Sequence, residues 1–328
     1  MRDTVRWGII GCGDVTERKS GPGFQKADGA HLVAVMRRDR TRAEDYARRH
    51  GVPRWYDDAD RLIADHDVDA VYIATPPATH VDYIRRVAEA GKPVYVEKPM
   101  GVSHAQSREA VSFCKSHSVP LFVAYYRRGL PKYRAVQDLL QSGAIGEVRF
   151  VQVTMQTRPV QALPSGELPW RVQRRHSGGG LILDLGSHGL DLLDFFLGPI
   201  AAVHGFASNQ AGLYEVEDMV SGAWVFDTGV HGSANWCFAS DRDQDSVAVY
   251  GSRGRLSFSV LDVGAPLTIS AASGNRTLSF EPPQHVQQPL IQMITDELRG
   301  RGRSPSTGES ALRTDWVLEQ LRNPGSAG

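Results

Sequence analysis

The sequence predicts an α/β protein in which a doubly wound parallel sheet is followed by an α+β domain with an open, mainly antiparallel sheet. Two observations predict this fold class. Up to residue 124, short apolar segments alternate with segments of helical spacing, a pattern typical of right-handed strand–helix–strand units in a parallel sheet. Beyond that point, strand-like segments follow one another with short turns and few helices between them, which is typical of antiparallel pairing.

The expected strands of the first half are apolar segments that end at glycine, proline or charged residues. The helices between them are predicted from apolar residues three and four positions apart, as in the segment that ends at Gly91. Such an alternation packs as a parallel sheet covered on both faces. We expect strands at 5–10, 31–36, 69–74, 94–97 and 119–124, and helices around 43–47, 83–88 and 102–116.

The second half is expected to start with a helix at 133–140 and a long strand at 147–157. A predicted helix at 178–197 would cover one face of the antiparallel sheet and leave the other face for a partner. We therefore expect a homodimer or homotetramer formed through this sheet. Further strands are expected at 201–208, 218–226, 230–238, 246–250, 255–259 and 267–271, and helices at 287–299 and 308–321.

The length of 328 residues suits two domains better than one. The change of pattern predicts a first domain at 1–124 and a second domain at 125–322, whose last helix could pack back on the first. Residues 323–328 are expected to form a flexible tail.

The composition is that of an ordinary soluble globular protein, with 41% hydrophobic and 23% charged residues. The 37 basic residues balance 37 acidic residues, which argues against nucleic acid or an anionic membrane as a partner. Cys12, Cys114 and Cys237 are odd in number and lack the spacing of a zinc site, which disfavours a disulfide framework and a structural metal. No signal peptide or membrane-spanning stretch is recognisable. We therefore expect a cytoplasmic protein that acts on small molecules.

A glycine-rich turn is expected where the first strand gives way to a helix. There, Gly11 would allow a tight turn and Gly13 would let a pyrophosphate approach the backbone, as in dinucleotide-binding proteins. The third glycine position of that fingerprint is Thr16, which we expect to loosen the helix–strand contact slightly. The alternative is a glycine-rich turn without a ligand.

Two arginines follow the second strand, where an enzyme that uses NAD would be expected to carry an acidic residue for the ribose hydroxyls. The guanidinium groups of Arg37 and Arg38 could bind a 2′-phosphate through charge-assisted hydrogen bonds, which favours NADP. NAD remains possible, because one arginine could stack on adenine or face solvent while Asp39 reaches a ribose.

Asp184 and His188 are spaced to share one face of the helix predicted at 178–197. A carboxylate beside an imidazole can fix its orientation for proton transfer. The alternatives are a hydrogen-bonded core histidine or a metal site. The remaining histidines are scattered without ligand spacing, so we expect no metal. No GxSxG nucleophile motif is present.

Lys98 follows the strand at 94–97 and precedes Pro99. At the carboxyl end of a parallel strand, its ammonium would face the crevice in which α/β proteins bind ligands. The alternative is a solvent-exposed lysine in a turn.

Four motifs occur in a fixed order along nearly the whole chain, and their combination resembles the Gfo/Idh/MocA family of glucose-fructose oxidoreductase and inositol dehydrogenase relatives. The resemblance implies an N-terminal Rossmann domain and a C-terminal domain for substrate binding, with an open sheet that often forms the dimer interface. It also implies NAD(P)-dependent oxidation or reduction of sugars, polyols and similar compounds. The motifs are Gly11-Cys12-Gly13-Asp14-Val15-Thr16, Ala74-Thr75-Pro76-Pro77-x-x-His80, Glu97-Lys98-Pro99 and Gly178-Gly179-Gly180-x-x-x-Asp184-x-Gly186-x-His188.

The resemblance also implies residue roles. Lys98 would hydrogen-bond the cofactor ribose and a substrate hydroxyl, His188 would be the general acid or base, and Asp184 would bind a substrate hydroxyl or steady the site. The Thr-Pro-Pro segment would lie beside the nicotinamide half of the cofactor. The implied cofactor-binding residues are Gly11, Gly13, Asp14, Val15, Arg37, Arg38, Thr75, Pro76, Pro77, His80, Glu97 and Lys98.

Two departures from the family pattern bear on function. Thr16 replaces the last glycine or alanine of the fingerprint, and Tyr125-Tyr126 stands where relatives often have asparagine before arginine, which leaves the substrate open. Further candidates for substrate contacts are Tyr126, Arg127, Trp170 and Arg171, with packing between domains as the alternative for each.

Three functions are compatible with these motifs. The first is hydride transfer between NADP(H) and a sugar-like substrate. The second is a redox-neutral relative that uses bound NAD(P) to cleave or epimerise a glycoside. The third is a cofactor-sensing binding protein, against which the joint presence of Lys98, Asp184 and His188 argues, since a sensor needs only the cofactor loop.

Overall fold

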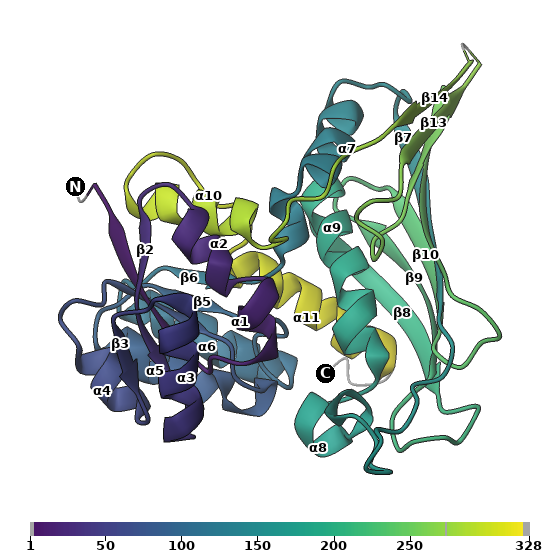
Figure 1. Ribbon diagram of the computed structural model, residues 1–328. Coiled ribbons are helices and arrows are strands. Elements are labelled where there is room, and N and C mark those ends of the chain that lie inside the picture. The colour runs from purple at the N-terminus through teal and green to yellow at the C-terminus, as the bar shows by residue number, and fades with distance from the viewer. Residues whose placement is uncertain (1–2, 273, 324–328) are drawn as a thin grey trace. The chain divides into compact units, whose positions relative to one another are not determined.

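In the computed structural model, which describes residues 3–272 and 274–323, the chain divides into two compact units (Figure 1). The first contains the residues up to Leu130 together with Pro283–Leu312, and the second contains Pro131–Pro282 together with the residues from Arg313 on. A C-terminal segment therefore returns to the first unit. Of the tail expected at 323–328, residues 324–328 lie outside the described residues.

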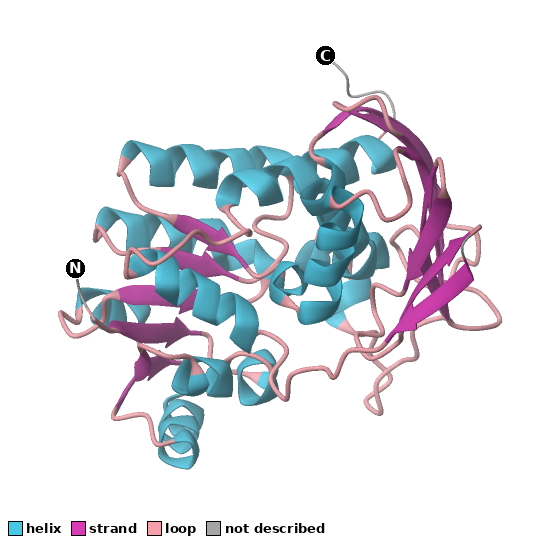
Figure 2. Cartoon of the chain, turned by 90° about the horizontal axis from the view of Figure 1, so that it is seen from above, coloured by secondary structure: helices cyan, strands magenta, loops and turns pink. Residues whose placement is uncertain are grey.

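The first unit contains a six-stranded sheet in the order β3-β2-β1-β4-β5-β6, in which every neighbouring pair is parallel. This confirms the doubly wound parallel sheet. Helices lie on both sides of it (Figure 2). The strands are β1 Val5–Ile10, β2 Ala30–Met36, β3 Arg54–Tyr56, β4 Ala70–Ile73, β5 Val94–Val96 and β6 Leu121–Val123. The helices are α1 Asp14–Arg18, α2 Gly21–Lys26, α3 Arg40–His50, α4 Ala59–Ala64, α5 His80–Glu89, α6 His104–Ser116 and α10 Gln288–Leu298, with 3₁₀ turns at Pro77–Thr79 and Tyr126–Gly129.

The strand order reverses at the centre of this sheet, because β1 pairs with β2 on one side and with β4 on the other. In open parallel sheets, ligands bind outside the carboxyl ends of the strands at such a reversal. The glycine turn after β1 and Thr75 after β4 therefore both lie at the position where a ligand is expected.

The second unit contains an eight-stranded sheet in the order β14-β13-β12-β11-β7-β10-β9-β8. Only β7 and β10 pair in parallel among its described strands, so the prediction of an open, mainly antiparallel sheet is confirmed. The strands are β7 Val148–Gln156, β8 Ile200–Ser208, β9 Met219–Phe226, β10 His231–Cys237, β11 Gln244–Gly251, β12 Gly254–Phe258, β13 Leu267–Ala271 and β14 Gly274–Leu278. The helices are α7 Pro131–Gln141, α8 Arg174–Ser177, a π-helix at Ile182–Gly186, α9 Ser187–Leu197 and α11 Gly308–Arg322, which belongs to this unit from Arg313 on, with a 3₁₀ turn at Trp170–Val172.

One face of this sheet is covered by helices α7 and α9 (Figure 1). Tyr133 of α7 and Phe196 of α9 both make edge-to-face contacts with Phe258 of β12, which anchors the two helices on that face. Side chains of the opposite face include Phe150, which stacks on Tyr250 with ring centroids 4.2 Å apart. Within the part of the chain that the structure describes, no helix has both the length and the apolar character needed to cross a membrane.

Candidate active site

The glycine turn after β1 is held against the end of β2 by backbone hydrogen bonds. The amides of Gly11 and Cys12 donate to the carbonyl oxygen of Met36 at 2.9 and 3.1 Å. Gly11 has a φ of +93°, and a Cβ there would lie 2.7 Å from Cγ2 of Thr75. Glycine is therefore required at position 11 by the chain itself.

Gly13 differs from Gly11, because the chain itself does not require glycine there. Its φ of −145° is extended backbone that any residue adopts. A Cβ added to Gly13 would meet nothing closer than the carbonyl oxygen of Gly11 at 3.9 Å. The space beside Gly13 is thus open to a ligand that approaches the backbone, as a pyrophosphate does in dinucleotide-binding turns.

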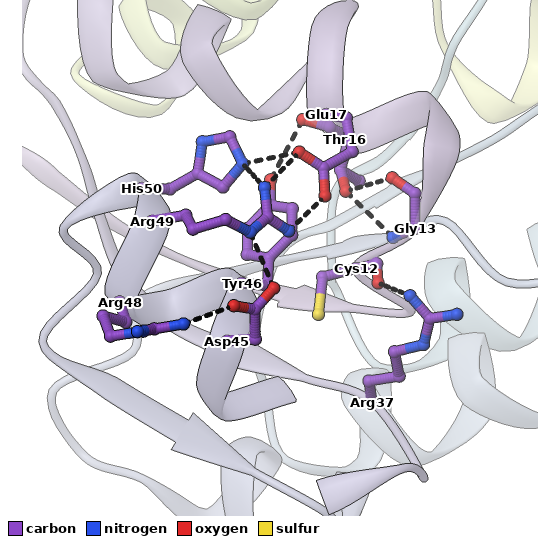
Figure 3. A network of polar contacts seen from close by, with 10 residues as sticks. All are labelled: Cys12, Gly13, Thr16, Glu17, Arg37, Asp45, Tyr46, Arg48, Arg49 and His50. Carbon is purple, nitrogen blue, oxygen red and sulfur yellow. Dashed lines mark hydrogen bonds and ion pairs between the residues drawn. The ribbon is translucent and has the colours of Figure 1, made fainter. Parts of the chain in front are cut away.

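Thr16 closes the glycine turn through its hydroxyl group (Figure 3), and the expectation that it loosens the helix–strand contact stays a prediction. Its hydroxyl donates to the carbonyl oxygen of Gly13 at 2.8 Å and accepts from the Gly13 amide at 3.0 Å. The hydroxyl of Tyr46 donates to the Thr16 carbonyl oxygen at 3.0 Å. Gly21 provides the room for this contact, because a Cβ there would collide with the Thr16 carbonyl oxygen and with the Tyr46 hydroxyl oxygen.

Arg37 places a guanidinium at the glycine turn, where its Nη1 donates to the carbonyl oxygen of Cys12 at 3.1 Å. Arg38 is exposed. The Asp39 carboxylate caps α3 by accepting from the Arg42 amide at 3.0 Å. The Asp39 carboxylate therefore already accepts a hydrogen bond from α3, which weakens the alternative that it binds an NAD ribose. Asp14 and Val15 begin α1, directly after the turn.

A group of charged residues joins α1 to α3 beside the turn (Figure 3). The carboxylate of Glu17 pairs with Arg49 and with His50, each at 2.7 Å, and these hydrogen bonds, that of Arg49 first, lower the pKa of Glu17 from 4.5 to about 2. Burial raises the pKa of the Cys12 thiol to about 11, so Cys12 is a packed thiol rather than a nucleophile.

His80 joins the loop after β4 to the turn after β5. Its Nδ1 lies 2.8 Å from the carbonyl oxygen of Pro99 and its Nε2 lies 2.8 Å from that of Thr75. The ring is fully buried, and burial lowers its pKa. His80 therefore lies between Thr75 and Pro99, and its neutral ring donates a hydrogen bond to one of their two carbonyl oxygens. Pro76 and Pro77 lie between Thr75 and the start of α5, and Pro77 is buried.

Lys98 lies at the carboxyl end of β5, as predicted. The carboxylate of the preceding residue, Glu97, accepts several hydrogen bonds. Glu97 accepts from the Tyr72 hydroxyl at 2.7 Å, from Nε2 of Gln287 at 2.6 Å and from the Lys98 amide at 3.2 Å. The Tyr95 hydroxyl in turn donates to Oε1 of Gln287 at 3.1 Å. Gln287 was not predicted, and nothing in its local sequence marks it.

The four further candidates for substrate contacts lie in two pairs, each with a guanidinium over a ring. In the first unit, Arg127 is 4.9 Å from the Tyr126 ring, and both residues are buried. In the second unit, Arg171 is 4.7 Å from the ring of Trp170, which is 41% exposed. Nε of Arg171 also donates to Asp184 at 2.8 Å. The structure therefore brings Arg171 and Asp184 into one ion pair, which the sequence did not predict.

The prediction of a single helix at 178–197 is wrong for the first part of this range. Gly178 ends α8 with a φ of +78°, a π-helix follows at Ile182–Gly186, and α9 begins only at Ser187. Asp184 lies in the π-helix and His188, which is 6% exposed, lies in the first turn of α9. Because π-helical hydrogen bonds span five residues, a separation of four is still about one turn. Single-turn π segments often occur at functional sites.

Among residues 3–272 and 274–323, no group of three or more His, Cys, Asp and Glu side chains is arranged to hold a metal ion.

Comparison with known proteins places both units in one family. A family model described as an oxidoreductase family with an NAD-binding Rossmann fold matches residues 5–125, and a model of the Gfo/Idh/MocA C-terminal domain matches residues 133–257. An oxidoreductase from Formosa agariphila is 36% identical over 320 residues, which cover 97% of this chain and 98% of the relative. D-xylose 1-dehydrogenase [NADP(+)] from Haloarcula marismortui is 31% identical over 260 residues, 77% of this chain and 71% of the relative.

Solved structures show the same fold. Levoglucosan dehydrogenase, in a complex with NADH and levoglucosan, matches with a TM-score of 0.83 at 21% identity and covers 97% of this chain and 96% of its own. With the glycine turn after β1, the Glu97-Lys98-Pro99 turn and the segment of Asp184 and His188 all present, the chain belongs to the Gfo/Idh/MocA family of NAD-binding oxidoreductases.

Proposed function

We propose that the protein is an NADP(H)-dependent oxidoreductase that transfers a hydride between nicotinamide C4 and a carbinol or carbonyl carbon of a sugar, polyol or related cyclic substrate. The observation that carries the proposal is the glycine turn, where open space beside Gly13 lies next to the guanidinium of Arg37. The names of the xylose and levoglucosan dehydrogenases support a sugar-like substrate. Free, buried Cys12 and Cys114 support a reducing, cytoplasmic location.

The residues of the first unit fit a dinucleotide. Gly11 and Gly13 form the turn that would receive the pyrophosphate, with Asp14 and Val15 directly after it. Arg37 and Arg38 would bind the 2′-phosphate of NADP, because guanidinium groups form charge-assisted and bidentate hydrogen bonds with phosphate. By the family resemblance, Thr75, Pro76, Pro77, Glu97 and Lys98 would surround the nicotinamide half, with His80 between two of these segments.

Oxidation of a carbinol removes a hydride from carbon, which the bound nicotinamide accepts, and a proton from oxygen, for which we propose His188 as the base. The ammonium of Lys98 would stabilise negative charge that develops on the same oxygen. Asp184 would orient a substrate hydroxyl, and its ion pair with Arg171 holds the carboxylate in place. Tyr126, Arg127 and Trp170 remain proposed substrate contacts. Reduction of a carbonyl uses the same groups in the reverse direction.

The test is a spectrophotometric screen of the purified protein with NADPH or NADP⁺ and a panel of aldoses, keto-sugars, inositols and anhydrosugars. We expect net formation or consumption of reduced nicotinamide with at least one sugar-like substrate. Product formation without any net change in reduced nicotinamide would instead support the redox-neutral alternative. Two results together would support a sensor. The protein would bind the cofactor but turn over no member of the panel, and Lys98→Ala and His188→Ala would bind every candidate as the native protein does.

We expect Arg37→Asp to reverse the cofactor preference. The aspartate would repel a 2′-phosphate, and the loss of hydrogen bonds to a charged group should raise the Kd for NADPH by about 10- to 100-fold, while NADH binding improves or is unchanged. Fluorescence titration with both cofactors measures this change. Arg48→Asp, which makes the same charge reversal at an exposed position of α3, is the control and should leave both Kd values unchanged. Equal effects of the two substitutions would contradict the assignment of Arg37.

We also propose a homodimer or homotetramer formed through the uncovered face of the second sheet. Phe206 of β8 is 78% exposed and Phe150 of β7 is 43% exposed, both on the face opposite the helices. Sedimentation should show a dimer or larger species, and Phe206→Asp should dissociate it. Leu163→Asp, at an apolar loop position that is 47% exposed, is the control. A native protein that sediments as a monomer at micromolar concentration would contradict the proposal.

A further inference from the structure

The three glycines before the π-helix are held by one nearly buried ion pair. Glu217 and Arg322 pair through Oε1 and Nε, with side chains only 8% and 13% exposed. The carboxylate of Glu217 accepts from the Gly180 amide at 2.9 Å, while Nη2 of Arg322 donates to the Gly178 carbonyl oxygen at 3.0 Å. The ion pair therefore holds both ends of the glycine segment.

Glu217 and Arg322 also leave no room for side chains on two of the three glycines. A Cβ on Gly179 would collide with the guanidinium of Arg322, and a Cβ on Gly180 would collide with the Glu217 carbonyl oxygen. Gly178 has a φ of +78°, which favours glycine for a separate reason. Side chains at these positions would push the backbone away from Glu217 and Arg322.

The held segment leads directly into the residues proposed for catalysis. The carbonyl oxygen of Gly180 accepts from the Leu183 amide at 3.1 Å, so the position of Gly180 sets the start of the π-helix that carries Asp184. The start of α8, which precedes the glycines, is held as well, because the Arg174 amide donates to the Glu215 carboxylate at 2.6 Å. A misplacement of about 1 Å in a catalytic group can cost 10²-fold in rate.

We propose that Glu217 and Arg322 are positioning residues for the proton-transfer site, which set the placement of Asp184 and His188 through the glycine segment. The inference rests on the proposed function of Asp184 and His188. It assigns a role in the reaction to two residues that lie far from both in sequence, one after β8 and the other at the end of α11.

A second ion pair in the same unit provides a matched control. Arg313 of α11 donates two hydrogen bonds to Asp194 of α9, at 2.7 and 2.8 Å, and the Asp194 side chain is 5% exposed. This pair also joins α11 to the segment that follows the glycines, but it lies at the opposite end of α9 from His188. If the Glu217–Arg322 pair had a purely structural role, its removal and the removal of the Asp194–Arg313 pair should have the same effect on kcat.

The experiment compares the double variant Glu217→Ala/Arg322→Ala with Asp194→Ala/Arg313→Ala. Both members of each pair are replaced, because a single substitution leaves a buried charge without its partner and is strongly destabilising. We expect the first variant to lose about 10- to 100-fold in kcat, with the Kd for NADPH within about twofold of native. Amides of the peptide 178–190 should exchange hydrogen faster in this variant than in the control, a readout that needs no substrate.

The control variant should keep kcat within about threefold of native, even if its unfolding temperature falls by as much as that of the Glu217→Ala/Arg322→Ala variant. If the first variant does not fold, Arg322→Lys replaces it, because an ammonium keeps the charge but lacks the planar guanidinium that reaches Glu217 and Gly178 together. Arg322→Lys should fold and lose part of kcat without a change in the Kd for NADPH.

Native kcat in the Glu217 and Arg322 variants, or an equal loss of kcat in the control, would overturn the inference. His188→Ala separates this failure from a failure of the proposed function. If His188→Ala is inactive while the Glu217 and Arg322 variants turn over normally, only the positioning role is wrong. If His188→Ala turns over normally, the proposed proton-transfer site itself is wrong.

Discussion

His188→Ala and Lys98→Ala are each expected to lower kcat by about 10²- to 10⁴-fold, the contribution that a positioned acid or base makes to proton transfer. The Kd for NADPH should change little in His188→Ala, since His188 belongs to the second unit. It should rise in Lys98→Ala, because we propose that this ammonium also binds the nicotinamide ribose. Steady-state kinetics together with fluorescence titration separates the two effects.

The controls for these substitutions are His66→Ala, at an exposed position in the loop after α4, and Lys115→Ala, at an exposed position of α6. Neither should change kcat. A loss of kcat in the test variants would then be specific to His188 and Lys98, and not a general effect of removing a histidine or a lysine. Native turnover in either test variant would remove that residue from the proposed mechanism.

Gly13→Ala is expected to weaken NADPH binding at least tenfold, about 1.4 kcal/mol, without lowering the stability of the protein. The extended backbone of Gly13 accepts alanine, and the added methyl group meets no atom of the chain within 3.9 Å. It would instead occupy the space in which we place the pyrophosphate. Titration with NADPH and thermal unfolding of the unliganded protein measure the two quantities.

Gly11→Ala is the matched comparison in the same turn. Its positive φ and its contact with Thr75 should lower the free energy of unfolding by about 1–3 kcal/mol, whether or not NADPH is present. The two glycines therefore separate a structural requirement from a ligand requirement. A Gly13→Ala variant that binds NADPH with native affinity would show that no dinucleotide lies against this residue.

The sequence was most informative where a strand meets a turn. The apolar segments that became β1, β4 and β5 end within one residue of the predicted positions, so Gly11, Thr75 and Lys98 could be placed at the carboxyl ends of parallel strands. The short strand β3 was missed, because its three residues are only half buried and carry no apolar pattern. Strand β14 was missed for a similar reason, since most of its side chains are exposed.

The π-helix at Ile182–Gly186 could not be predicted from helical spacing. Its apolar residues fit an α-helix equally well, and it directly follows three glycines whose positions depend on distant residues. Those glycines are held by Glu217 and Arg322, residues 105 positions apart in sequence. Gln287 and Glu97 meet across 190 positions. Contacts of this kind leave no periodic signal in a single sequence.

The return of Pro283–Leu312 to the first unit has a consequence for biosynthesis. Gln287 completes the hydrogen bonds of Glu97, Leu290 packs against Gly129, and the hydroxyl of Ser306 donates to the Val123 carbonyl oxygen at 2.7 Å. The dinucleotide-binding unit is therefore complete only when the ribosome has translated as far as Leu312. The first unit cannot reach its final structure before the part of the second unit at Pro131–Pro282 has been translated.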